Sequence, residues 1–384
     1  MLIGFNFMIG YTRNQIVSLA LQQESSTDTV VAGIDHETGE FKRKAVAMKE
    51  KIRVGIIGAG RMAYWHLKGY KKNKDVEVTA IAGKTKANIE KLKESFNIPH
   101  GYTNYREMLN AEKLDAVNIT TPTHTHCQIT IDCLQAGCHV LCEKPMAMTL
   151  EEARQMIEAE RAANKILMIG FSQRFYKEFV HMKDIIARGE LGAIKVAWYR
   201  RGINMPPQKW YAEPDKSAGV TTELAIHGID WLRWIINSRV VQVSAELTEN
   251  SLYPGIDDNV WIMLKFENGA IGVVGASYCF PFLKRDIGVV GDKMALTVER
   301  GKVIMEKYGD YSLGMLVMKF IKYCFIIPYW LLYNPFQKEV EHFISCIRNG
   351  NTPLATSEDG KISLEIALAA KESAQSGKKI KLYL

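Results

Sequence analysis

The sequence has no C-x-x-C cysteine pair, no long run of one charge, no internal repeat and no low-complexity tract. Its seven cysteines are an odd number, and four lie among apolar neighbours over 127–142, where cysteine usually serves as a small core residue. This pattern argues against a disulfide scaffold and predicts a reduced, cytoplasmic protein. The net charge of +7 comes from interspersed lysines and acids, which favours an anionic small molecule or membrane face over nucleic acid.

The N-terminus also lacks the features of a signal peptide. It has no basic n-region, Asn6 interrupts its apolar run, and no small-residue cleavage site follows. Residues 1–47 are predicted to be an extension of uncertain structure, or the remnant of a fused upstream domain. Met48 directly precedes the first predicted strand and resembles a natural start.

The 384 residues are enough for two domains with cores of their own. From Ile52 onward, short β-branched runs alternate with amphipathic segments, which is typical of a parallel sheet covered by helices. We therefore expect an α/β Rossmann domain for dinucleotide binding over 48–172. The expected strands are 53–57, 76–82, 115–120, 139–142 and 166–170, and the expected helices lie near 62–72, 86–96, 125–136 and 149–163.

The pattern changes after Phe175, where strand-like runs are separated by turn signals. Asn268-Gly269, Asp292-Lys293 and Arg300-Gly301 are the expected turns. They predict an α+β domain over 173–384 with a large, mostly antiparallel open sheet, one face packed on helices and one free for a partner. Two late helices near 335–349 and 358–376 could pack on either domain.

A glycine-rich loop follows the first strand and opens a helix. Gly58 and Gly60 permit a tight turn and close approach of a pyrophosphate, and Ala63 lets helix and strand pack closely. Arg61 and Met62 begin the helix, whose N-terminus attracts the anion. The alternative, a glycine-rich turn without a ligand, does not explain the match of strand, spacing and helix.

The end of the second strand bears on the choice of cofactor. NAD-binding folds usually place an acid there for the ribose hydroxyls, but this chain has Lys84 and Thr85. A lysine beside a hydroxyl would suit a 2′-phosphate, so the sequence predicts NAD or NADP with a slight preference for NADP. A solvated surface lysine is the alternative.

Polar residues also follow the next two strands, at the sheet edge where nucleotides bind. Thr121 and Pro122 are expected beside the cofactor, and His126 is expected to face the nicotinamide side, where it binds the cofactor, or to cap a helix. No third ligand accompanies the H-x-H pair, so no metal is predicted. Glu143 and Lys144 reach the same edge and are also expected to contact the cofactor. Lys144 could act in chemistry there or simply pair with Glu143.

These motifs together carry a family resemblance. The GxGxxA loop, the EKP motif (143–145), GFSQRF (170–175) and SAGVTTELAIHGIDW (217–231) resemble those of the Gfo/Idh/MocA oxidoreductases, named after glucose–fructose oxidoreductase and inositol dehydrogenase. The resemblance covers about 52–384. It implies an NAD(P)-dependent dehydrogenase or reductase of a sugar, cyclitol or nucleotide sugar. It also implies a homodimer or homotetramer through the C-terminal sheet.

The resemblance assigns roles to three residues. His227 is expected as general base or acid, Lys144 as the group that polarises and relays a proton, and Glu223 as substrate orienter. Glu223 and His227 are i and i+4 neighbours if one helix holds both. The family's acid is normally aspartate and its glycine turn is richer, so the pose of the substrate stays open. A buried His227 satisfied by Asp230 is the alternative.

Further residues are expected around the cleft between the domains. Arg174, with Phe171, is expected to shape it on the substrate side. Trp210, with its neighbour Tyr211, is expected in a loop across cofactor or substrate. Arg200 and Arg201 end a strand beside that loop, where they could hold a phosphate or carboxylate or be merely exposed.

An apolar stretch over 313–333 is longer than a simple connection requires. It could be a hydrophobic helix covering the sheet or a subunit contact, or a membrane anchor with snorkelling lysines. A true span is disfavoured by its two lysines and proline. If this stretch contacts a membrane, the protein could be a membrane-surface dehydrogenase in envelope-sugar synthesis. Independently of this stretch, a catalytically silent binding protein of the same fold also stays open.

Overall fold

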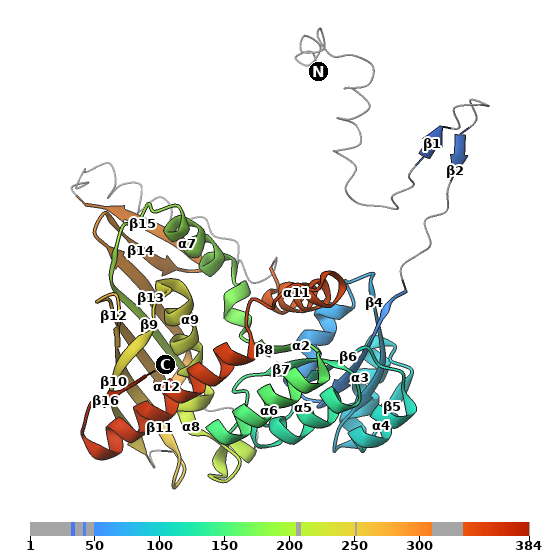
Figure 1. Cartoon of the computed structure of the whole chain (residues 1–384). Helices are drawn as coiled ribbons and strands as arrows, with labels where there is room; N and C mark the ends of the chain where they lie inside the picture. Colours follow the sequence, from blue (N-terminus) through green and yellow to red (C-terminus); the bar gives the residue numbers. More distant parts are fainter. Residues whose placement is uncertain are drawn as a thin grey trace. The chain divides into compact units, whose positions relative to one another are not determined.

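The computed structural model describes residues 32–34, 41–43, 50–204, 209–249, 252–308 and 333–383 (Figure 1). The chain forms two compact units, Met1–Glu50 and Lys51–Leu384. In the first unit, strand β1 (Ala32–Ile34) pairs antiparallel with strand β2 (Phe41–Arg43). The rest of the predicted extension over 1–47 lies outside the described residues.

The first sheet of the second unit has six parallel strands in the order β5-β4-β3-β6-β7-β8. The five predicted strands are confirmed, and the short strand β5 is an addition. Chain order reverses between β3 and β6, which is the switch point where such sheets bind ligands. The strands are β3 (Ile52–Ile57), β4 (Val76–Ala82), β5 (His100–Tyr102), β6 (Ala116–Ile119), β7 (His139–Glu143) and β8 (Leu167–Gly170).

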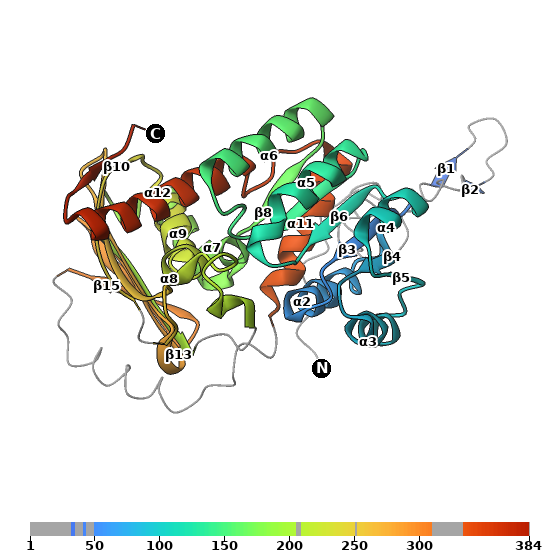
Figure 2. The same ribbon diagram turned by 90° about the horizontal axis from the view of Figure 1, so that it is seen from below.

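Helices cover both faces of this sheet (Figures 1 and 2). On one face Leu67 packs with Phe343 of the late helix α11, and on the other Ile129 packs with Met156. The four predicted helices are confirmed, and α4 was not predicted. The helices that follow the strands are α2 (Arg61–Tyr70), α3 (Lys86–Phe96), α4 (Tyr105–Ala111), α5 (His126–Gln135) and α6 (Leu150–Ala163).

The second sheet has eight strands in the order β15-β14-β13-β9-β12-β11-β10-β16. Only the β9–β12 pair is parallel, so the prediction of a mostly antiparallel sheet is confirmed. The three predicted turns join neighbouring antiparallel strands. The strands are β9 (Ile194–Asn204), β10 (Val240–Glu249), β11 (Asp257–Phe266), β12 (Ile271–Ser277), β13 (Cys279–Gly291), β14 (Met294–Glu299), β15 (Lys302–Lys307) and β16 (Ile380–Lys381).

The two faces of this sheet differ as its alternating pattern predicts. Along β11, Val260, Ile262 and Leu264 are buried in one core with helix residues, whereas Trp261 and Met263 are 53% and 57% exposed. The buried face packs on helices α9 and α12. The helices of this region are α7 (Lys177–Ala187), α8 (Gly219–Glu223), α9 (Ile226–Ile236), α11 (Pro335–Asn349) and α12 (Ser357–Ser376).

The late helices α11 and α12 pack on both parts of the second unit. Helix α11 packs on α2, whereas α12 contacts α6 of the first sheet and β10 of the second. The apolar stretch 313–333 lies outside the described residues except for Tyr333, and its predicted membrane or subunit contact stays a prediction. Among the described residues, no helix is both long and apolar enough to cross a bilayer.

Candidate active site

The glycine-rich loop has the geometry that a dinucleotide requires. Gly58 has a φ of +108°, and an added Cβ would lie 2.7 Å from the carbonyl of Thr120, so only glycine fits. A Cβ at Gly60 would have no described protein atom within 4 Å, so the backbone there is open to a ligand. Ala63 is fully buried and packs in the core between α2 and the sheet.

This loop forms one wall of a cavity of about 920 Å³ between the two sheets. The lining comes from the switch point, from η3 (Lys209–Ala212) and from α8 and α9. Ala63, His126 and Arg174 are predicted site residues that do not line it. Those that do are Gly58, Gly60, Arg61, Met62, Lys84, Thr121, Pro122, Glu143, Lys144, Trp210, Glu223 and His227.

Lys144 reaches the cavity directly after the end of β7. Its peptide bond to Pro145 is cis, and its Nζ donates a 2.8 Å hydrogen bond to the backbone oxygen of Glu223. Lys144 is therefore not simply an ion-pair partner of Glu143. Burial lowers the pKa of Lys144, and the nearby carboxyls of Glu223 and Glu143 only partly oppose this.

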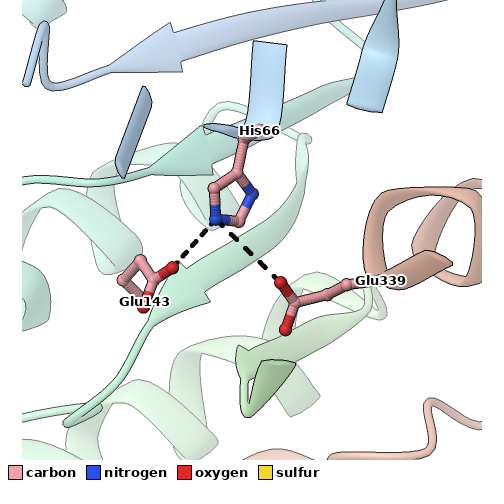
Figure 3. A group of neighbouring side chains, drawn as sticks. All are labelled: His66, Glu143 and Glu339. Carbon is pink, nitrogen blue, oxygen red and sulfur yellow. Dashed lines mark hydrogen bonds and ion pairs between the residues drawn. The ribbon is translucent and has the colours of Figure 1, made fainter. Parts of the chain in front are cut away.

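A buried cluster behind the cavity holds Glu143 in place (Figure 3). His66 of α2 lies with its Nε2 2.8 Å from Glu143 Oε1 and 4.0 Å from Glu339 Oε2 of α11. Burial alone would raise the pKa of Glu143, but the hydrogen bond with His66 and the charge of Lys144 lower it. The carboxyl of Glu339 makes no hydrogen bond with any residue that the structure describes, and burial beside Glu143 raises its pKa well above the usual range. These opposite directions favour Glu143 as the charged member and Glu339 as the protonated one.

Replacing Glu339 with glutamine should stabilise the fold increasingly as the pH rises. Folded Glu339 keeps its proton at pH values where the unfolded chain has lost it. The wild type therefore loses about 1.4 kcal/mol of stability for each pH unit between the unfolded and folded pKa. Glutamine does not titrate, so the free energy of unfolding of E339Q minus that of wild type should increase from about pH 5 to about pH 8 in urea titrations.

Glu341 is the matched control for this experiment. It lies on the same helix but reaches the surface, where its carboxylate accepts a 2.8 Å hydrogen bond from Lys338. Burial would raise the pKa of Glu341, but Lys338 and Gln337 lower it, so it is ionised in both states over this range. The free energy of unfolding of E341Q minus that of wild type should not change with pH. If the difference for E339Q is also independent of pH, Glu339 is not protonated in the folded state.

Glu223 and His227 line the cavity from two separate helices. Helix α8 ends at Glu223 and α9 begins at Ile226, so the prediction that one helix presents both as i, i+4 neighbours is wrong. Thr123 donates a 2.8 Å hydrogen bond to Glu223 Oε1, and burial raises the pKa of this carboxyl. Burial, with the charges of Lys144 and Arg201, holds the pKa of His227 well below its usual range.

Gly219 fixes the start of α8. It has a φ of +71°, and an added Cβ would lie 1.7 Å from Asp257 Oδ1, so the turn before α8 requires glycine here. Asp257 in turn accepts a 2.7 Å hydrogen bond from the backbone N–H of Thr221. The single glycine kept from the family's richer turn is therefore the one that the geometry needs.

Two predicted site residues support the cavity from behind. His126 is buried, with Nδ1 2.8 Å from the Pro145 oxygen and Nε2 2.8 Å from the Thr121 oxygen. It links the loops after β6 and β7, so the prediction that it faces the nicotinamide conflicts with its placement. It is the first residue of α5, whose N-cap is Thr125, so His126 does not cap this helix as the other prediction states.

Arg174 is the second predicted site residue that supports the cavity from behind. Its predicted place on the substrate side also conflicts with the structure. It lies in η2 (Ser172–Phe175), 3% exposed, and its Nε donates a 3.0 Å hydrogen bond to Asp230 Oδ2. Its Nη1 lies 3.0 Å from Asp359. Because Arg174 engages Asp230, the alternative in which Asp230 satisfies His227 finds no support. Phe171 is likewise buried in the core of the first sheet.

Two sequence matches cover most of this structure. Residues 52–171 match the profile described as oxidoreductase family, NAD-binding Rossmann fold, and 179–297 match the Gfo/Idh/MocA C-terminal domain. Together they span more than half of the chain. The chain belongs to the Gfo/Idh/MocA oxidoreductase family.

Known members resemble this Gfo/Idh/MocA protein over almost their full lengths. The myo-inositol 2-dehydrogenase of Thermotoga maritima is 28% identical over 340 residues, which are 86% of this chain and 98% of that protein. The scyllo-inositol 2-dehydrogenase (NAD(+)) of Bacillus subtilis is 26% identical over 344 residues, 87% of this chain and 97% of that protein. The WlbA dehydrogenase from Bordetella pertussis, solved with NADH and UDP-GlcNAcA, shares the fold with a TM-score of 0.77. It is 22% identical and covers 88% of this chain and 99% of its own.

The sequence analysis did not predict several of the residues that line the cavity of this Gfo/Idh/MocA protein. Tyr278 lies between β12 and β13, Phe336 comes from α11, and neither carries a motif. Gln173 lies inside the GFSQRF motif and could have been chosen over Arg174, because it lines the cavity and accepts a 2.8 Å hydrogen bond from Tyr199. Lys84 and Thr85 line the opposite end, beyond the glycine loop.

Proposed function

We propose that this chain is an NAD(P)-dependent dehydrogenase or reductase acting on a secondary alcohol or ketone of a sugar, cyclitol or nucleotide sugar. The observation that carries the proposal is that Lys144 and His227 face one cavity with the glycine loop. Burial lowers the pKa of Lys144 toward the range useful for proton transfer, and it keeps the His227 ring neutral and able to accept a proton or a hydrogen bond. The inositol dehydrogenases among the relatives support this substrate class.

The residues at the switch point fit a bound dinucleotide. The open backbone at Gly60 and the N-terminus of α2 would hold its pyrophosphate, and Thr121 and Pro122 would border its nicotinamide half. When bound, the cofactor supplies a carbon that accepts or gives a hydride. The protein has then to place the substrate carbon beside it and manage the proton on the substrate oxygen.

Lys144, His227 and Glu223 are proposed to manage that proton. His227 is neutral because its pKa is held low, so it can accept the hydroxyl proton during oxidation. Lys144, anchored by the Glu223 oxygen, can polarise the substrate oxygen and relay the proton. The Glu223 carboxyl, held by Thr123, would orient a neighbouring substrate hydroxyl. In ketone reduction the same groups return the proton.

We also propose that NADP is preferred to NAD. Lys84 and Thr85 line the end of the cavity that follows β4, where NAD-binding folds usually carry an acid. A 2′-phosphate would gain a cationic partner there, and an acid that repels it is missing at that strand end.

Cofactor reduction measured over a panel of inositols, aldoses and nucleotide sugars tests both proposals. The wild type should turn over at least one member, with kcat/KM for NADP at least about threefold above that for NAD. Tight NADPH binding without turnover of any member would instead indicate a silent binding protein. Equal or higher kcat/KM with NAD would contradict the cofactor preference alone.

The exposed face of the second sheet is proposed to pair with a second copy of the chain. Trp261 and Met263 are more than half exposed on β11, and Ile271 on β12 is 43% exposed. Covering such a face is favourable because it removes apolar surface from water. Light scattering should give a dimer or tetramer mass, and a monomer at micromolar concentration would contradict this.

A further inference from the structure

Arg201 occupies a position in the cavity that no step above uses. It lies on β9, where successive side chains point to opposite faces of the sheet. Arg201 lines the cavity, whereas its neighbour Arg200 is absent from the lining and lies 5.8 Å from the Trp261 ring centroid. Trp261 belongs to the exposed face, so the strand separates two arginines that the sequence alone could not distinguish.

The Arg201 guanidinium has no protein partner among the described residues. Its Nε is shielded from solvent and makes no hydrogen bond, and no carboxylate of the described chain forms an ion pair with it. Arg201 is half-buried, and its Nε is cut off from water without an acceptor, which is costly unless a ligand supplies one.

The two carboxyls that line the cavity are already engaged. Glu143 lies 2.8 Å from His66, and Glu223 accepts from Thr123 while its backbone oxygen accepts from Lys144. Lys144 is a second cation at this end of the cavity, and the charge of Arg201 reaches it and His227. Lys144 and both carboxyls therefore have partners within the protein, whereas Arg201 has none among the described residues.

We propose that Arg201 binds an anionic group of the substrate, so that the preferred substrate is a sugar carrying a carboxylate or a phosphate rather than a neutral polyol. Guanidinium binds both groups through paired, charge-assisted hydrogen bonds. The cofactor's pyrophosphate does not explain the residue, because its binding loop at Gly58 and Gly60 belongs to the other sheet. The proposal rests on the proposed function and narrows its substrate class.

The test compares one ring with three substituents: D-glucose, D-glucuronate and D-glucose 6-phosphate. Turnover and binding to the NADPH-saturated protein by calorimetry are measured for wild type, R201Q, R201K and the matched control R200Q. The wild type should bind at least one anionic sugar about 10- to 100-fold more tightly than glucose. R201Q should remove this preference with NADPH binding unchanged, R201K should restore part of it, and R200Q should behave as wild type.

The outcomes separate the two proposals. The anionic sugar that binds more tightly than glucose shows whether the site prefers a carboxylate or a phosphate. Equal binding of glucose and both anions by the wild type, or an anion preference that survives in R201Q, overturns the inference and leaves the dehydrogenase proposal standing. If no sugar of any panel is turned over, the dehydrogenase proposal fails, and the calorimetry still decides whether Arg201 is an anion site.

Discussion

Replacing Lys144 with methionine should lower kcat by about 1,000-fold or more while dinucleotide binding changes by less than about threefold. Lys144 Nζ lies at the end of β7 inside the cavity and is fixed 2.8 Å from the Glu223 oxygen. Methionine fills a similar volume but neither polarises the substrate oxygen nor carries a proton. The binding surface of the glycine loop is unaffected. Stopped-flow turnover and NADPH fluorescence titration measure the two effects.

The pH profile adds a second readout for Lys144. Because burial lowers the pKa of the Lys144 ammonium, the neutral amine forms at lower pH than in a free lysine. The kcat/KM for alcohol oxidation by the wild type should rise with pH through this lowered pKa. In Lys144→Arg the charge is kept but the proton is not released, so the rise should disappear.

Lys183 provides the matched control for these variants. It is a partly buried lysine that donates to the backbone oxygen of Trp234, and burial lowers its pKa as it does for Lys144. It does not line the cavity. Lys183→Met should therefore keep turnover within about threefold of wild type. Full turnover in Lys144→Met, or equal losses of turnover in both methionine variants, would contradict the proposed role of Lys144.

The parallel sheet could be predicted because each of its longer strands has a recognisable local sequence pattern. Runs such as 53–57 and 76–82 are apolar, β-branched and bounded by turn residues, and the structure confirms them. The misses are short: β5 has three residues and α4 has seven, too few for a periodic pattern to form. Their ends depend on caps such as Asn104, which accepts from the backbone N–H of Arg106.

The cavity residues were predictable where chain order alone sets their place. Lys144 and Thr121 follow parallel strands, and such strands bring their carboxyl ends to one edge. Direction of the side chain was not predictable by this argument. His126 and Arg174 lie at the expected positions in the chain but turn into the protein, because buried carbonyls and carboxylates satisfy them there.

Contacts between distant segments account for the remaining failures. The pairing of His66 with Glu143 and Glu339 joins residues from α2, β7 and α11, and no local sequence pattern predicts it. The break between Glu223 and His227 is similar, since both would suit a continuous helix by spacing alone. In the structure, packing of α8 against β11 and of α9 against β9 sets two separate helices.

Removing the Arg174 cation should strongly destabilise the fold. Arg174 joins η2 to Asp230 of α9 and to Asp359 at the start of α12, and both η2 and α9 contribute residues to the cavity lining. Replacing Arg174 with methionine leaves Asp230 buried without its cation. Removing one partner of such a pair costs about 3–5 kcal/mol in the free energy of unfolding.

Arg161 is the control, because it pairs at 3.0 Å with Glu358, the residue before Asp359, but is 71% exposed. Arg161→Met should cost less than about 1 kcal/mol. The loss in Arg174→Met should also depend on pH. Burial raises the pKa of Asp230 even beside Arg174, and without the cation its folded pKa rises further above the unfolded value.

A raised carboxyl pKa makes the folded state bind the proton more tightly, so stability falls as pH rises through the interval between the unfolded and folded pKa. The destabilisation by Arg174→Met in urea titrations should therefore be larger at about pH 8 than at about pH 5. Asp230→Asn in the Arg174→Met background should recover part of the loss at the higher pH, because the buried charge is gone. A pH-independent loss, or a loss no larger than that of Arg161→Met, would mean that this buried ion pair does not hold η2, α9 and α12 together.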